Sequence, residues 1–70
     1  MLVKTKNSTY RVTGQGDRFL VQKVSAENPE STYLNVGESR VSDYVDIQLG
    51  GSMRFGGGVR TSTVVSVTEE

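Results

Sequence analysis

Three consecutive glycines, Gly56, Gly57 and Gly58, separate a short apolar segment from a long run of Val, Thr and Ser residues. Glycine adopts the positive φ angles of tight turns without steric strain, and β-branched residues favour strands. The pattern therefore predicts a β-hairpin with residues 52–55 as its first arm and residues 59–68 as its second. The second arm would be the longest strand of the protein, with shorter strands arranged around it.

The size of the chain and the absence of two residue types limit how it can be stabilised. With 70 residues it forms one domain, and a domain this small buries only about 60% of its unfolded surface. There is no cysteine for a disulfide and no histidine, so a zinc site would need carboxylate ligands alone. Small domains without such supports often gain stability by oligomerising. We expect one domain over residues 1–68, a frayed acidic tail at residues 69–70, no metal, and either a homo-oligomer or a complex with a host protein.

The remainder of the chain alternates short extended segments with turn residues. We expect strands at residues 2–6, 18–24, 32–36 and 44–49, a strand or a loop at residues 40–43, turns at residues 14–17, 37–39 and 50–51, and a surface loop at residues 25–31. Residues 7–9 are Asn, Ser and Thr, whose side chains bond to nearby backbone. They fit either a bulge in one bent strand or a turn between two strands, and residues 10–12 resume the extended pattern.

Alternation along these segments predicts which side chains face the core. The expected inward-facing residues are Tyr10, Val12, Val45, Ile47 and Leu49. In the segment at residues 18–24, one face carries Phe19, Val21 and Lys23, and the other carries Leu20, Gln22 and Val24. Apolar residues on both faces indicate a strand near the middle of the sheet or at a barrel closure.

No segment has a helical period, and about five or six short strands follow one another with turn signals between them. This spacing is typical of an all-β barrel or sandwich. With eight glycines and only two phenylalanines, the sequence fits sharp barrel corners better than a thick sandwich core. We expect a small antiparallel barrel, SH3-like or half-open. Residues 59–67 would form an edge strand able to accept a strand from another chain.

The residue types present argue against catalysis. Histidine, the commonest general acid or base, and nucleophilic cysteine are both absent. Gly14 and Gly16 lack the third glycine and the following helix of a dinucleotide-binding loop, and no Lys-Ser or Lys-Thr pair follows the glycine triplet. Asp43 and Asp46 lack the glycine-centred loop of a calcium site. We expect neither an enzyme nor a bound cofactor.

The predicted hairpin places two positive charges together, because Arg54 would lie directly opposite Arg60. Like charges in this arrangement destabilise a sheet. We hypothesise that the pair is relieved by an acidic residue, such as Asp46 or the tail at residues 69–70, or by an anionic partner. The loop at Gly56, Gly57 and Gly58 is expected to close the hairpin, and successive backbone amides in such a loop can also contact an anion.

A second basic group supports a different hypothesis. Lys4 and Lys6 share one strand face, and together with Arg11 they would form a basic patch beside which tyrosines stack on bases. The tyrosines available for stacking are Tyr10, Tyr33 and Tyr44. However, eight acidic residues balance eight basic ones, so the chain lacks the basic excess typical of proteins that bind nucleic acid or anionic membranes.

Two segments near the ends of the chain resemble those of one group of proteins. Residues 3–10 read Val-Lys-Thr-Lys-Asn-Ser-Thr-Tyr, and residues 60–67 read Arg-Thr-Ser-Thr-Val-Val-Ser-Val. They are similar to the first and last strands of small uncharacterised β-rich proteins of actinobacteria and their phages. The resemblance implies a β-rich accessory protein encoded by a phage or prophage, and it assigns no functional residues.

Taken as a sequence, the chain favours a non-enzymatic protein-interaction module that self-associates or binds a host protein. No apolar run approaches the ~20 residues of a membrane span, and the first residues do not form a signal peptide. We therefore expect a cytoplasmic protein that does not contact membranes. The alternative is a nucleic-acid or nucleotide-binding small β-barrel that uses Lys4, Lys6, Arg54 and Arg60.

Overall fold

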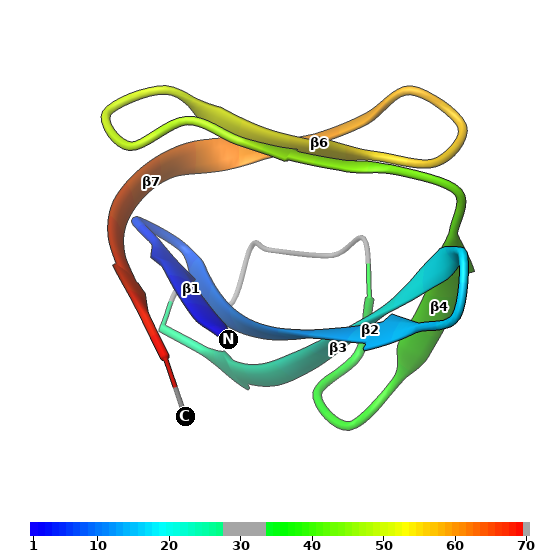
Figure 1. Ribbon diagram of the computed structural model, residues 1–70. Helices are drawn as coiled ribbons and strands as arrows, with labels where there is room; N and C mark the ends of the chain where they lie inside the picture. Colours follow the sequence, from blue (N-terminus) through cyan, green and yellow to red (C-terminus); the bar gives the residue numbers. More distant parts are fainter. Residues whose placement is uncertain (28–33, 70) are drawn as a thin grey trace.

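The protein is a curled antiparallel sheet, seen in a computed structural model that describes residues 1–27 and 34–69. The strands are β1 (Leu2–Thr5), β2 (Ser8–Gln15), β3 (Arg18–Ala26), β4 (Ser39–Ser42), β5 (Val45–Ile47), β6 (Ser52–Phe55) and β7 (Val59–Thr68). Within the described residues there are seven strands, in the order β4-β3-β2-β1-β7-β6-β5, and they curl into a half-barrel (Figure 1). The all-β, half-open architecture is confirmed, and the strand number is slightly higher than expected.

Strand β7 links the two layers of the half-barrel. Its first part pairs with β6, in a register that sets Phe55 opposite Val59. Its second part pairs with β1, from Thr5 opposite Val64 to Leu2 opposite Thr68, with a shift of register between Lys4 and Thr5. Such a bulge bends a strand and increases its twist, and Figure 1 shows β7 curving from one layer into the other. With ten residues it is also the longest strand in the described part of the chain, as predicted.

The prediction that residues 59–67 form an edge strand is wrong for the strand as a whole, because β7 is not at either end of the sheet. Within the described residues, β7 has β1 on one side and β6 on the other, and the two outermost strands are β4 and β5. The pairing of β1 with β7 joins segments about sixty residues apart in sequence. Hydrophobic alternation reports only which side of a strand is buried, so it carried no signal for this long-range pairing.

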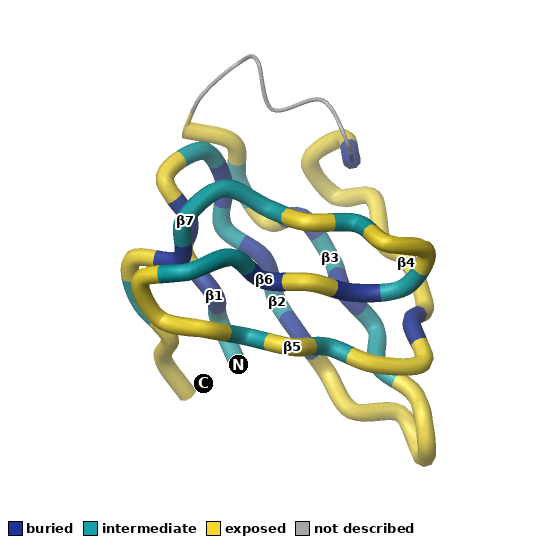
Figure 2. The backbone as a smooth tube through the Cα atoms, turned by 90° about the horizontal axis from the view of Figure 1, so that it is seen from above, coloured by how far each residue is buried: buried dark blue, intermediate teal, exposed yellow. Residues whose placement is uncertain are grey.

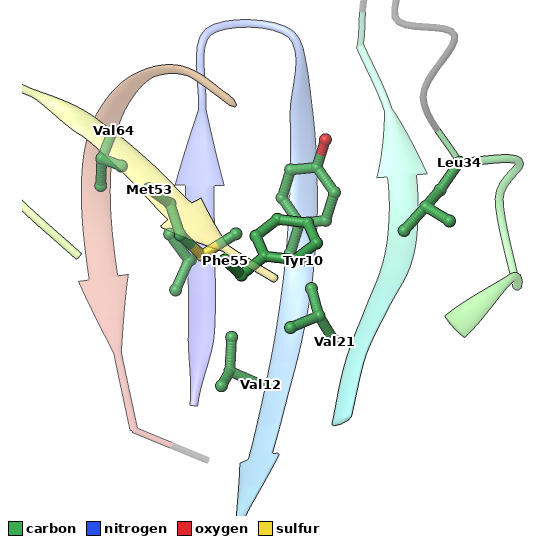
Figure 3. Close-up of a cluster of buried hydrophobic side chains, with 8 residues drawn as sticks. Tyr10, Val12, Val21, Leu34, Met53, Phe55 and Val64 are labelled. Carbon is green, nitrogen blue, oxygen red and sulfur yellow. The ribbon is translucent and has the colours of Figure 1, made fainter. Parts of the chain in front are cut away.

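The core lies between the two layers and is built from small and medium side chains. Its buried apolar residues are Val3, Tyr10, Val12, Val21, Leu34, Met53, Phe55 and Val64. Figure 3 shows Met53 and Phe55 of β6 pointing toward Tyr10 of β2 and Val21 of β3. Figure 2 shows that the turn between β2 and β3 is exposed, whereas the middles of these strands are buried. The predicted burial of Tyr10 and Val12 is confirmed.

The first two hairpins have short turns with identifiable causes. Residues 7–9 were expected to form either a bulge in one bent strand or a turn between two strands. The structure has two strands with a turn between them, and Thr5 stabilises that turn. Its hydroxyl donates to the Ser8 carbonyl at 2.9 Å and accepts from the Ser8 amide at 3.1 Å. The second turn is shorter than residues 14–17, because β2 continues to Gln15, which pairs with Arg18. Gly16 takes a φ of 65°, which a two-residue hairpin loop requires at its first position.

Three further predictions need correction. Leu49 does not face the core: it is 71% exposed, because β5 ends at Ile47 and an isolated parallel bridge to Val64 holds the chain outside the barrel. Residues 34–36 form no strand, although Leu34 is buried, and residues 32–33 lie outside the described residues. Residues 25–26 belong to β3 and not to a loop, and the rest of that expected loop beyond Glu27 also lies outside the described residues.

Lys23 connects β3 to the segment that follows it. Its side chain is only 1% exposed, and its ammonium group donates to the Leu34 carbonyl at 2.8 Å. Its backbone amide donates to the Glu38 carbonyl, and its carbonyl accepts from the Gly37 amide. A buried ammonium is tolerated only when it is hydrogen-bonded. Lys23 therefore fastens residues 34–38 against the barrel through both its main chain and its side chain.

We predict that Lys23→Ala lowers the free energy of unfolding by about 2–5 kcal/mol, because it deletes a fully buried aliphatic stem. A domain of this size has only ~3–5 kcal/mol in total, so the variant should lose a large part of its stability. Lys23→Met keeps the stem and should lose less, about 1–3 kcal/mol. Urea unfolding followed by circular dichroism measures both, with the exposed Lys6→Ala as the matched control. Equal stability of Lys23→Ala and Lys6→Ala would contradict the structural role of Lys23.

Candidate functional site

A shallow hollow of about 630 Å³ lies at the hairpin formed by β6 and β7. It is lined by Tyr44, Arg54, Gly58, Val59 and Arg60. Arg54 and Arg60 are exposed, whereas their neighbours Met53 and Phe55 on β6 are buried. Alternation along the strand therefore turns both guanidinium groups outward, away from the core. The surroundings are polar, cationic and open to solvent.

The two arginines lie opposite each other, as the sequence predicted: the register of β6 and β7 pairs Arg54 with Arg60. Opposed residues on one sheet face have Cβ atoms ~5 Å apart. Two unit charges ~5 Å apart in water repel each other by about 1 kcal/mol, and the long exposed side chains of Arg54 and Arg60 let their guanidinium groups lie farther apart. The pair is thus mildly unfavourable for folding in the absence of a counter-charge.

One acidic residue lies on the strand beside the arginine pair. Asp46 of β5 pairs in register with Arg54. Yet within the described residues, no carboxylate oxygen forms an ion pair within 4.0 Å of either arginine. Glu69 follows the far end of β7, and Figure 1 shows the C-terminal end on the opposite side of the molecule from the β6–β7 hairpin. The other residue of the expected acidic tail, Glu70, lies outside the described residues.

Ser42 positions the wall of the hollow opposite the arginines. Its hydroxyl donates to the Tyr44 carbonyl at 2.5 Å and accepts from the amide of Gly56 at 2.7 Å. The Tyr44 hydroxyl in turn donates to the Phe55 carbonyl at 3.3 Å, while the residue remains 45% exposed. These bonds join the turn between β4 and β5 to the end of β6. They place the Tyr44 ring beside the arginines.

Each position of the glycine triplet has a structural reason for glycine. Gly57 and Gly58 both have φ near 80°, a conformation that other residues rarely adopt. At Gly56, an added Cβ would lie 3.0 Å from the Ser42 hydroxyl oxygen, so a larger residue would press against the closing hydrogen bond. The triplet is therefore the hairpin loop that the sequence predicted. Gly58 is its one member that lines the hollow.

The remaining predicted basic residues are not gathered at this site. Lys4 lies on β1 and Lys6 in the turn after it, both exposed, and neither lines the hollow. Tyr10 is part of the core and cannot stack on a base, and Tyr33 lies outside the described residues. Of the three candidate tyrosines, Tyr44 is the one that the structure places beside a basic pair.

A second polar cluster, at the end of β3, is distinct from the hollow. The hydroxyl of Ser25 donates to the Glu27 carboxylate at 2.9 Å, and that of Thr9 donates to it at 3.0 Å. The hydrogen bond from Ser25, supported by that from Thr9, lowers the pKa of Glu27 below its usual value. The cluster is exposed and links β2 to β3. None of its residues lines the hollow.

The geometry suits the binding of an anionic group. An arginine guanidinium presents donors in a planar fork that matches a carboxylate or phosphate, and two such forks side by side with an aromatic ring favour a planar or acidic ligand. None of the residues that line the hollow is a carboxylate, histidine or cysteine. Within the part of the chain that the structure describes, no three His, Cys, Asp or Glu side chains gather in a way that could hold a metal ion.

Comparisons with protein-family models, with curated proteins and with solved structures give no match. In residues 1–27 and 34–69, no helix is long and apolar enough to cross a membrane.

We predict that Ser42→Ala lowers the free energy of unfolding by about 1–3 kcal/mol, because the Gly56 amide loses its acceptor in a partly buried position. Ser39→Ala, an exposed position at the start of the same strand, is the matched control and should have little effect. Urea unfolding measures both variants. If Ser42→Ala is as stable as Ser39→Ala, the hydroxyl does not hold this side of the barrel together.

Proposed function

We propose that this protein is a non-enzymatic interaction module that binds an acidic group of a partner protein through Arg54, Arg60 and Tyr44. One observation carries the proposal: two opposed arginines share an open hollow and have no acidic side chain within ion-pair distance among the described residues. A ligand carboxylate placed between them would remove their mutual repulsion and accept hydrogen bonds from both. The ligand would then supply the close ion pair that the described residues do not form with either arginine.

The hollow is suited to a ligand that is recognised by direct contact and not by long-range electrostatic attraction. Because acidic and basic residues are equal in number, the protein as a whole has no field that would attract polyanions from a distance. Specificity would therefore come from the geometry of the two guanidinium groups and from the Tyr44 ring. Hydrogen bonds that fasten Tyr44 reduce the side-chain entropy lost on binding.

The alternative function, binding of nucleic acid or a nucleotide, draws on the same arginines and tyrosine. It requires a continuous basic surface along which successive phosphates lie. Lys4 and Lys6 belong to β1 and its turn, whereas Arg54 and Arg60 belong to the β6–β7 hairpin, so the basic residues are divided between the two layers. This division is the reason for preferring an acidic protein partner. The resemblance to phage proteins extends the proposal to a phage-encoded module that binds a cytoplasmic host protein.

We predict that Arg54→Ala/Arg60→Ala weakens binding of a synthetic glutamate-rich peptide at least about tenfold, because charge-assisted hydrogen bonds are lost. The unfolding free energy should stay unchanged or rise by up to about 1 kcal/mol, since the like-charge pair is gone. Titration of the ¹⁵N-labelled protein, followed by NMR, measures the affinity. The shifts should concentrate at the amides of Tyr44, Arg54, Gly58 and Arg60.

Lys4→Ala/Lys6→Ala is the matched control, because it removes the same charge from the other layer. It should leave peptide binding unchanged. If the arginine double variant binds the peptide as tightly as the wild type, the proposed site is wrong. If an oligothymidylate binds more tightly than the peptide, with affinity that falls steeply as salt rises and is weakened equally by both double variants, the nucleic-acid function replaces it.

A further inference from the structure

The second half of β7 has one flank without a neighbour. Strand β6 pairs with β7 only as far as Thr63, and the backbone of Gly50 and Gly51 bonds to Val64 on the same flank. Beyond that point, Ser66, Val67 and Thr68 pair with β1 on their other flank, and Val65 is the extra residue of the bulge. Among the described residues, no strand or backbone hydrogen bond covers the flank of residues 65–68 that faces away from β1. Figure 1 shows this part of β7 running along the margin of the molecule.

Apolar side chains next to this open flank are exposed to solvent. Val65 is 48% exposed and Val67 is 38% exposed. Leu49, at 71% exposed, is tied by its bridge to Val64, so it lies where the open flank begins. An open strand flank with apolar side chains beside it is a template for pairing with another strand.

The charge pattern identifies the partner as a second copy of the same segment. Residues 61–68 contain no charged residue, no proline and no glycine. Sheet edges in monomeric proteins usually carry charges or prolines that oppose pairing. The two outermost strands follow that rule, with Arg40 on β4 and Asp46 on β5. If either outer strand paired antiparallel with its own copy, like charges would come close together, whereas the β7 flank meets its own copy without repulsion.

We propose that two copies of this protein associate through residues 65–67 of β7, paired antiparallel about a two-fold axis that sets Ser66 opposite Ser66 of the second copy. Such an isologous contact closes on itself and gives a dimer. It joins the two half-barrels by a continuous sheet and covers Leu49 and Val65 on both copies. The contact goes beyond the proposed function, because the arginine hollow lies at the beginning of β7 and the open flank lies at its end. Both hollows of the dimer stay open.

The first test is the dependence of molar mass on concentration, measured by sedimentation equilibrium on the whole chain. The wild-type protein should shift from one copy toward two as concentration rises. Val65→Lys places a charge on the flank of each copy and should hold the mass at that of one copy. Val41→Lys makes the same change at a half-exposed position of the outer strand β4 and should leave the wild-type shift intact. A wild-type mass of one copy at every concentration, or equal effects of the two lysine variants, overturns the proposal.

A second test does not depend on how well Val65→Lys folds. The chain has no cysteine, so one introduced thiol reports on a single position. Under mild oxidation, Ser66→Cys should form a disulfide-linked dimer, and Val41→Cys should stay largely unlinked. Equal linking of the two variants overturns the proposal.

Arg54→Ala/Arg60→Ala should dimerise like the wild type, and loss of dimer in that variant would place the contact at the hollow and overturn the assignment to β7. Conversely, Val65→Lys should keep its affinity for the glutamate-rich peptide, so failure of one proposal leaves the other intact.

Discussion

The half-barrel depends on one strand hydrogen-bonding to different partners along its two halves. In β7 the backbone groups near Val59 are satisfied by β6, and those near Val67 are satisfied by β1. Backbone groups in a buried sheet must be paired, so the change of partner is possible only where the strand bends and moves from one layer to the other. The bulge beside Thr5 and Val64 provides that bend. Without it, the strands carrying Met53 and Phe55 would not lie over those carrying Val3 and Tyr10, and the core would have a single wall.

The opposite side of the barrel is held together by far fewer hydrogen bonds. There the layers meet where the chain passes from β4 to β5, and the Ser42 hydroxyl bonds to both Tyr44 and Gly56. One side is thus closed by a continuous strand, and the other by the chain that passes from β4 to β5 and by hydrogen bonds of the Ser42 and Tyr44 side chains. The same hydroxyl that closes the fold also sets the position of Tyr44, so the shape of the hollow and the integrity of the barrel are coupled.

Local features of this protein could be predicted from sequence, and long-range ones could not. The glycine triplet, with β-branched residues after it, was enough to place the hairpin and to set Arg54 opposite Arg60, because a hairpin register follows from its turn. The alternation of apolar and polar residues correctly predicted that Tyr10 and Val12 are buried. It failed at Leu49, because alternation does not report where a strand ends, and it gave no sign that β1 lies beside β7. For the site, the arginines had a sequence signal, whereas Ser42 had none: its role depends on a contact with Gly56, fourteen residues away.

The pairing of β1 with β7 also has a consequence for how the protein is made. Residues 2–5 emerge from the ribosome early, but the residues that cover them, 64–68, are translated after every other strand of the half-barrel. Proteins dominated by such distant contacts fold slowly, since a long loop must close before any contact forms. Until then the β1–β2–β3 meander carries Val3 and Tyr10 on a face with no second layer above it. The nascent chain therefore passes through a stage in which this apolar face is complete while the strand that joins the two layers has not yet been synthesised.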